Sequence, residues 1–192
     1  MSILQFSEDE LAEKLRSINL EYRVAFAAAC AERLFACYSL YAGLTKTDPK
    51  AKVRKALDYG WKYLTDGQYD PNVLDGHIDV VSELLPTDPW RPEMDAAEDA
   101  AAAVVFMLEC LKDDSVQSAC WAAGRAYAAR DNYIASRMDG TNIDGDKILS
   151  NELVQSELSR QERDISQLIS QSVSVAQLRE RSQSESATFL PS

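Results

Sequence analysis

The chain contains 192 residues, of which 46% are hydrophobic, and 20 basic against 31 acidic residues give a formal net charge of −11. This size and composition suit a single globular domain with a buried core, and seven glycines and six prolines are few for a β-rich fold with many tight turns. The acidic balance argues against direct binding to nucleic acid or to an anionic membrane surface, because both require clustered lysine and arginine.

Apolar residues recur at helical spacing along most of the chain, which predicts an all-α, single-domain bundle of about seven helices. Residues 1–172 form the predicted helical domain. The helices are expected at about 7–18, 20–43, 49–64, 71–85, 93–112, 115–138 and 147–170. Ser7 is the predicted N-cap of the first helix, and Asp48 and Asp70, each followed by a proline, are the predicted N-caps of the third and fourth.

Two segments lack the helical pattern. The stretch 139–146, DGTNIDGD, has some spacing of a calcium-binding loop, but Lys147 stands where that loop needs glycine, so we predict a turn. Residues 173–192 are polar and rich in serine, with few core-forming side chains. We therefore expect a polar, flexible C-terminal tail, with at most a short helix at 175–181.

The segment 20–43 is the most apolar part of the chain, and its apolar residues cover more than one helix face. A helix that is apolar nearly all round is expected at the centre of a bundle. Glu32 and Arg33 lie within this segment. Buried charges must be paired, and the last long helix offers partners for Arg33 at Glu157, Glu162 and Asp164. We interpret them as structural ion pairs, with a functional pocket as the alternative.

The acidity of the chain is local. Between residues 66 and 109 there are eleven acidic residues and one basic residue, Arg91. Asp75, Asp79 and Glu83 occur at i, i+4 and i+8 of one predicted helix, so they share a face on which like charges repel. A second acidic group lies in the first turns of the next helix, where the helix dipole favours carboxylates. The first group therefore lacks the structural explanation that the second one has.

We considered three interpretations of this acidic region: a solvated surface, a docking surface for a basic protein, and a metal site. The leading hypothesis is a non-enzymatic, protein-binding module that docks a basic protein partner, with steering by opposite charge. One concrete version is an immunity protein that neutralises a basic bacterial toxin. The predicted partner-binding residues are Asp75, Asp79, Glu83, Asp95, Glu98 and Asp99.

Two alternatives remain open. The first is a Mg²⁺-dependent hydrolase of a small phosphate compound, for which Asp95, Glu98 and Asp99, together with Glu10 and Glu13, form partial carboxylate motifs. The companion motif is missing, and so is a lysine or arginine cluster to hold phosphate. The second alternative is a structural homo-oligomer, such as a homodimer, whose interface includes Trp90.

The remaining chemistry-bearing residues predict no catalytic site, metal or cofactor. The cysteines lie in apolar, alanine-rich segments without a CxxC pair, at Cys30, Cys37, Cys110 and Cys120. We expect them to be reduced core residues. His77 is the single histidine and has no evident triad partner. The N-terminal segment lacks the features of a signal peptide and no long charge-free apolar window is present, so we expect a cytoplasmic protein without a membrane span.

Several short motifs resemble a known family. The stretch ACAERL at 29–34 with Tyr38, then Leu57 and Trp61, then ERDI at 162–165, are similar to landmarks of the YjaG-like bacterial proteins. That family is a domain of unknown function. The resemblance implies an all-helical fold and implies no catalytic residues. The sequence departs from the family pattern before Tyr38, where Ala36 and Cys37 stand in place of a proline.

Overall fold

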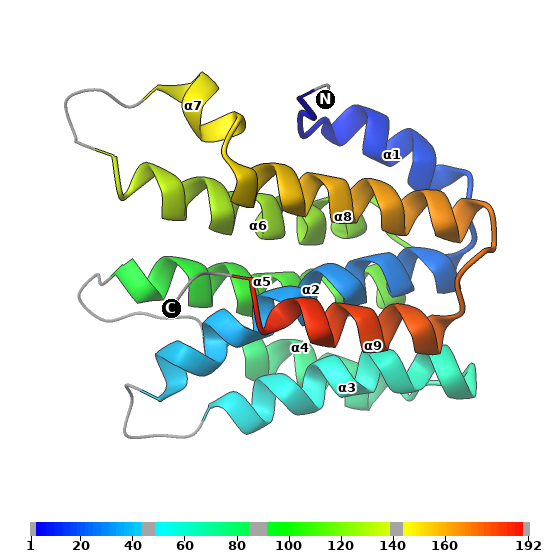
Figure 1. Cartoon of the computed structure of the whole chain (residues 1–192). Helices are drawn as coiled ribbons and strands as arrows, with labels where there is room; N and C mark the ends of the chain where they lie inside the picture. The colour runs from blue at the N-terminus through cyan, green and yellow to red at the C-terminus, as the bar shows by residue number, and fades with distance from the viewer. Residues whose placement is uncertain (1–2, 44–48, 85–91, 139–143, 190–192) are drawn as a thin grey trace.

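A computed structural model describes residues 3–43, 49–84, 92–138 and 144–189, and these residues form helices joined by short connections (Figure 1). The helices are α1 (Glu8–Arg16), α2 (Leu20–Ala42), α3 (Lys50–Asp66), α4 (Pro71–Ser82), α5 (Pro92–Asp113), α6 (Val116–Ala135), α7 (Gly145–Leu149), α8 (Glu152–Ile169) and α9 (Val175–Ser186). The predicted all-α class is confirmed. The stretch 139–143, Asp48 and Trp90 lie outside the described residues, so the predictions made for them remain untested.

The predicted count of about seven helices is too low, because the described residues form nine. The expected helix at 147–170 is divided into α7 and α8. The division falls at Ser150 and Asn151, where the Asn151 side chain accepts a hydrogen bond from the Leu153 N–H at 3.0 Å and starts α8 as its N-cap. The other additional helix is α9, within the segment expected to be a flexible tail.

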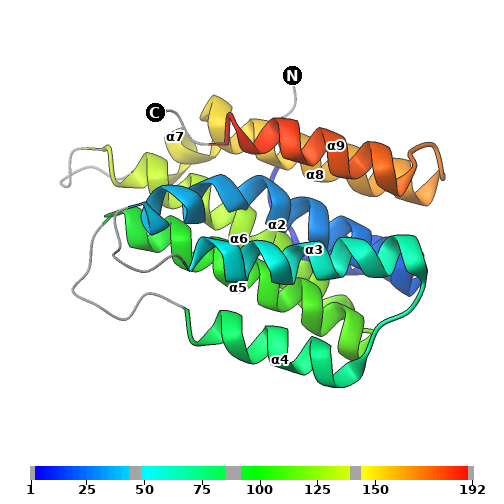
Figure 2. The same ribbon diagram turned by 90° about the horizontal axis from the view of Figure 1, so that it is seen from below.

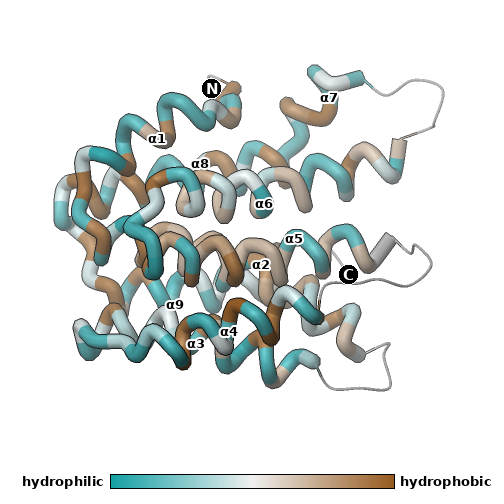
Figure 3. The backbone as a smooth tube through the Cα atoms, turned by 180° about the vertical axis from the view of Figure 1, so that it is seen from behind, coloured by the Kyte–Doolittle hydropathy of each residue, from teal (hydrophilic) through white to brown (hydrophobic). Residues whose placement is uncertain are grey.

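Helix α2 lies at the centre of the bundle and packs against α3, α5, α6, α8 and α9 (Figures 1 and 2). Figure 3 shows how its mostly apolar path runs through the interior beside α5. It is the one helix in the described part of the chain that is long and apolar enough to cross a membrane, but 72% of its most apolar window is buried against the rest of the protein. The bundle is built around this helix, as its all-round apolar pattern predicts.

The predicted helix starts at Ser7 and Asp70 are confirmed. The Ser7 hydroxyl accepts a hydrogen bond from the Glu10 N–H at 3.3 Å. The Asp70 carboxylate accepts one from the Asn72 N–H at 2.9 Å, with Pro71 in the first turn of α4. Each cap satisfies a backbone donor that the first turn of the helix leaves unpaired.

Helix α9 lies along α2 and is packed into the core rather than detached from it (Figure 1). Ser174 and Gln177 form a reciprocal capping box at its start, and Leu178 and, just beyond the helix, Phe189 are fully buried. The small side chains of Ser182 and Ser186 are also buried. The described part of the expected flexible tail is therefore helical and anchored. The sequence of this segment predicts a flexible tail because few of the side chains that anchor it are apolar.

Replacing Leu178 with alanine tests whether α9 is part of the folded unit. We expect Leu178→Ala to lower the free energy of unfolding by about 2–4 kcal/mol, because it removes a fully buried side chain and leaves a cavity. Urea denaturation measures the change. The exposed Glu180 of the same helix provides the control, and a Leu178→Ala variant as stable as Glu180→Ala would contradict the packing of α9.

Candidate functional site

The predicted acidic face lies on two antiparallel helices at one edge of the bundle, α4 and α5 (Figure 2). On α4, Asp79 is exposed, and Glu83 is exposed at the C-terminal end of the helix. Asp75 is partly exposed and forms an ion pair with Lys112, whose ammonium nitrogen lies 2.8 Å from the carboxylate. The start of α4 therefore lies beside the end of α5. Lys112 offsets part of the charge at this end of the face.

The three predicted residues of α5 have different surroundings. Glu98 is exposed and Asp95 is half-buried. Asp99 is only 4% exposed and accepts a hydrogen bond from the Arg125 guanidinium of α6 at 3.1 Å. Burial raises the pKa of Asp99 to about 6, against the opposing effect of Arg125. Asp99 thus faces α6 inside the bundle, which leaves Asp79, Glu83 and Glu98 as the exposed carboxylates of the predicted set.

The described residues contain no group of three or more His, Cys, Asp or Glu side chains placed to hold a metal ion. The two partial carboxylate motifs also belong to different parts of the bundle. Glu10 and Glu13 lie exposed on α1, which packs against α6 and α8, whereas Asp99 is paired with Arg125. The acidic residues in this part of the structure are therefore spread over surfaces rather than gathered around one point.

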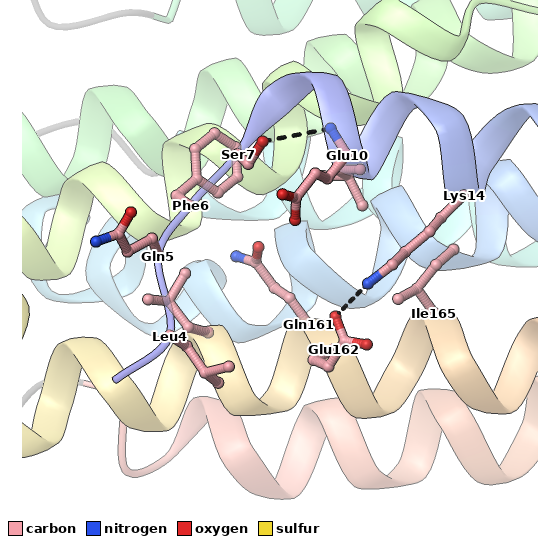
Figure 4. A pocket seen from close by; sticks show the side chains of 11 residues that line it. Leu4, Gln5, Phe6, Ser7, Glu10, Lys14, Gln161, Glu162 and Ile165 are labelled. Atoms are coloured by element: carbon pink, nitrogen blue, oxygen red, sulfur yellow. Dashed lines mark hydrogen bonds and ion pairs between the residues drawn. The ribbon is translucent and has the colours of Figure 1, made fainter. Parts of the chain in front are cut away.

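The interior holds a second charged region, centred on Arg33 of α2. The Arg33 side chain has no solvent exposure. Its Nε donates to Glu157 Oε2 at 3.0 Å, its Nη2 donates to Glu157 Oε1 at 2.9 Å, and its Nη1 donates to Asp164 Oδ2 at 2.7 Å. The predicted structural ion pair is confirmed, with two of the three proposed partners. The third, Glu162, instead pairs at the surface with Lys14 at 2.6 Å (Figure 4).

Glu32, the neighbour of Arg33, is also buried and paired. Its carboxylate accepts hydrogen bonds from both Nη atoms of Arg54, at 2.6 and 2.9 Å, and from the Trp61 indole N–H at 2.8 Å. Arg54 also donates a hydrogen bond to Asp58. Asp58 accepts a second hydrogen bond, from Arg179 of α9. Glu32, Arg33 and Asp164 belong both to these ion pairs and to the motifs that resemble the known family. In this protein the ion pairs hold α3, α8 and α9 on the central helix.

The pairing around Arg33 extends through α8 and α9. Asp164 Oδ1 accepts hydrogen bonds from Arg163 and Arg181, and Glu185 pairs with Arg163 at 2.8 Å. We define the ion cluster as five arginines with three carboxylates: Arg33, Arg130, Arg160, Arg163, Arg181, Glu157, Asp164 and Glu185. Within the described residues the cluster has two more cations than anions, in a chain whose overall charge is strongly negative.

Three hollows formed by described residues are candidates for ligand binding. The cavity in Figure 4, between α1 and α8, has about 60 Å³, far less than ligand pockets of about 300–1,000 Å³. A shallow hollow of about 350 Å³ lies on α5 and α6 beside Trp121, which is 44% exposed and packs on Phe106. A groove of about 490 Å³ runs between α2 and α9, with Glu32, Cys37 and Ser186 among its lining residues. Only the groove adjoins buried charged side chains.

The cysteines and the histidine have the surroundings of structural residues. All four cysteines are buried and unbridged, and burial raises the pKa of Cys37 and Cys110 to about 12 and that of Cys120 to about 11. Thiols with such pKa values have little reactive thiolate near neutral pH. The His77 ring packs against Tyr59, and burial, followed by the charge of Lys55, lowers its pKa. The predicted core location of the cysteines is confirmed.

The fold and the charged interior define this protein as an all-helical bundle whose central helix carries buried ion pairs. Residues 10–189 match the family model "Protein of unknown function (DUF416)", and the chain belongs to this family. A crystal structure of a DUF416 family protein from Shewanella baltica OS155 superposes with a TM-score of 0.76 at 19% sequence identity, covering 92% of this chain and 93% of that one. This likeness supports the fold. No curated protein matches the chain.

The pH dependence of stability should reveal the buried Asp99. Its pKa is about 6 in the folded state, against an ordinary value of 3.8, so the folded protein binds the proton more tightly than the unfolded chain. The contribution of this proton to the free energy of unfolding has its full size below about pH 4 and is lost as the pH rises through about 6. We expect Asp99→Asn to gain about 2–3 kcal/mol relative to the unsubstituted protein between pH 4 and 7, measured by urea unfolding. A pH-independent difference would contradict the burial of Asp99.

Removing Arg33 should destabilise the protein strongly. Arg33→Met leaves Glu157 and Asp164 buried without their main partner, which costs about 3–5 kcal/mol in comparable sites. Denaturant titration measures the loss. Adding Glu157→Gln to Arg33→Met should recover much of it, because Glu157 is then no longer a stranded charge, whereas Asp164 keeps Arg163 and Arg181 as partners. Equal stability of the single and double variants would show that the cost comes from lost packing.

Proposed function

We propose that this protein is a non-enzymatic, protein-binding module that docks a basic protein through the exposed acidic face of α4 and α5. The observation that carries the proposal is the exposure of Asp79, Glu83 and Glu98 on α4 and the start of α5. Among the described residues of these two helices, Lys112 is the basic residue that pairs with the face, through Asp75. Many of the arginines are held in ion pairs elsewhere in the fold, so the charge of this face is only partly offset.

A one-signed face of this kind acts mainly on association. Opposite charge raises the rate of encounter, and the gain falls as salt screens the charges over about 8 Å at physiological ionic strength. Exposed carboxylates also need no rearrangement of the core to meet a partner. A basic protein is the matching ligand class, because the face has neither a deep cavity for a small molecule nor a gathered set of metal ligands within the described residues.

The more specific version of the proposal is an immunity protein that neutralises a basic bacterial toxin in the cytoplasm. Its support is the analogy between a small acidic helical protein and the charge of many nuclease toxins, and fold alone does not assign such a role. The narrower assignment to a YjaG-like group within the family has the same standing. It rests on the short motifs around Arg33, Trp61 and Asp164.

The alternatives gain less from the geometry. A Mg²⁺-dependent hydrolase needs carboxylates around one ion, and the described residues do not gather them. A homo-oligomer has one observation in its favour, the exposed Trp121 above Phe106 on α5 and α6. The hollow beside Trp121 is shallow and lies away from the acidic face. Experiments can therefore test self-association through Trp121 separately from docking of a basic protein.

Charge reversal tests the docking face directly. The triple variant Asp79→Lys, Glu83→Lys and Glu98→Lys should lose capture of basic proteins from a lysate of the source organism, because repulsion replaces attraction at the contact. Three immobilised baits are compared at low and high salt by quantitative mass spectrometry: the unsubstituted protein, the triple variant and a matched control. The control reverses three exposed carboxylates elsewhere, Glu13, Glu152 and Glu180.

The control carries the same change in net charge, so it separates a local face from a general acidic effect. We expect one or a few basic proteins to bind the unsubstituted and control baits at low salt, at least tenfold more than the triple variant. Equal capture by all three baits, or equal loss from both substituted baits, would reject this location for the interface. Circular dichroism confirms that the variants are folded.

A further inference from the structure

Arg130 of α6 is buried, and among the residues that the structure describes it has no carboxylate partner. The residue is only 1% exposed. Nη1 donates to the Leu153 carbonyl at 2.9 Å and to the Ser156 hydroxyl at 3.0 Å, and the guanidinium lies 4.3 Å from the centre of the Phe189 ring. Nε and Nη2 have no hydrogen-bond partner in the structure as described. Two orphaned donors on a buried cation are costly unless something completes the site.

The charged residues around Arg130 do not supply the missing partners for its Nε and Nη2 donors. Glu157 is the nearby carboxylate that favours the charged guanidinium, but both its oxygens already accept hydrogen bonds from Arg33. Arg160 and Arg33 oppose the charge, and burial is the largest effect, so the pKa of Arg130 falls to about 10. Arg160 also has a buried Nη1 without a partner, and its Nε lies 3.8 Å from Glu185, beyond hydrogen-bonding distance.

We propose that Arg130 and Arg160 form a binding site for a small oxyanion of the phosphate class, at the place where α6, α8 and the segment after α9 meet. The observation that points to an anion is the set of buried donors without partners, Nε and Nη2 of Arg130 and Nη1 of Arg160. A guanidinium edge with two free N–H donors matches two oxygens of a tetrahedral oxyanion, and Arg160 supplies a further donor. Nothing in the acidic-face proposal depends on this site, because it lies in the interior beside α2 and α9.

The groove between α2 and α9 adjoins the surroundings of Arg130 through Cys37, whereas neither arginine is among the residues that line it. Cys37 lines that groove and lies close enough to Arg130 for the guanidinium charge to lower the pKa of its thiol against the larger effect of burial. The Phe189 ring covers the guanidinium. Because Nε and Nη2 have no solvent-accessible surface, an anion reaches them when the chain at Phe189 moves aside. Phe189 follows the end of α9 by three residues, so this movement leaves the helix itself in place.

Titration of the full chain with inorganic phosphate tests the site. Direct binding is measured by isothermal titration calorimetry, and the melting temperature is measured in millimolar phosphate and in sodium chloride of equal ionic strength. We expect saturable phosphate binding to the unsubstituted protein and a higher melting temperature in phosphate than in chloride. Arg130→Met should weaken phosphate binding at least tenfold and abolish the phosphate-specific shift, and Arg160→Met should weaken binding to a smaller extent.

The behaviour of Arg130→Met in chloride separates a ligand site from a purely structural arginine. A vacant site has an uncompensated buried charge, so the variant should melt at or above the temperature of the unsubstituted protein in chloride and below it in saturating phosphate. If Arg130 serves only the bundle, through Leu153, Ser156 and Phe189, the variant loses the same stability in both salts. Arg137→Met, an exposed arginine just beyond α6, controls for the charge and should keep the phosphate response.

No saturable phosphate binding to the unsubstituted protein, together with equal destabilisation by Arg130→Met in both salts, would overturn the oxyanion site.

Discussion

The pairing of Arg33 with Glu157 and Asp164 is the constraint on which the rest of the structure depends. A guanidinium at the centre of an apolar helix is tolerable only if carboxylates reach it with good geometry, and both of its partners come from α8. Asp164 then accepts from Arg181, which brings α9 to the same point. One buried charge on α2 thus links α8, which also packs through its own apolar face, to α9, which has few apolar residues.

This arrangement explains how a chain with such different halves forms one bundle. Helices α2 and α5 provide much of the apolar interior. Helix α9 attaches to it mainly with charged and small polar side chains, and α8 combines its ion pairs with a buried apolar face. The arginines that make these ion pairs are buried or partly buried, and their charges are neutralised there and not at the acidic face. Acidic residues on α4 and on the start of α5 are then left exposed on an opposite edge (Figure 2). The charged interior and the acidic exterior are therefore two consequences of one distribution of charge.

The sequence predicts the helical class, the central helix and the partners of Arg33, because each depends on local periodicity or on a charge that stands out among apolar residues. It does not predict α9, whose anchors Leu178 and Phe189 are isolated in a polar segment. Asp99 appears in the sequence beside exposed Glu98, and only the packing of α6 shows that it is buried. Arg130 directly precedes Asp131 and resembles a solvated pair. Its unpartnered donors arise from the meeting of three distant segments, which no local pattern records.

Native-state hydrogen exchange, followed residue by residue, tests most directly whether the buried ion pairs hold α8 and α9 on the central helix. If the ion pairs hold both helices, amides of α9 between Leu178 and Ser186 are protected nearly as strongly as those of α8, and Arg33→Met lowers protection in both helices together. Rapid exchange throughout α9 in the unsubstituted protein, or loss of protection confined to α2 in the variant, would contradict this dependence.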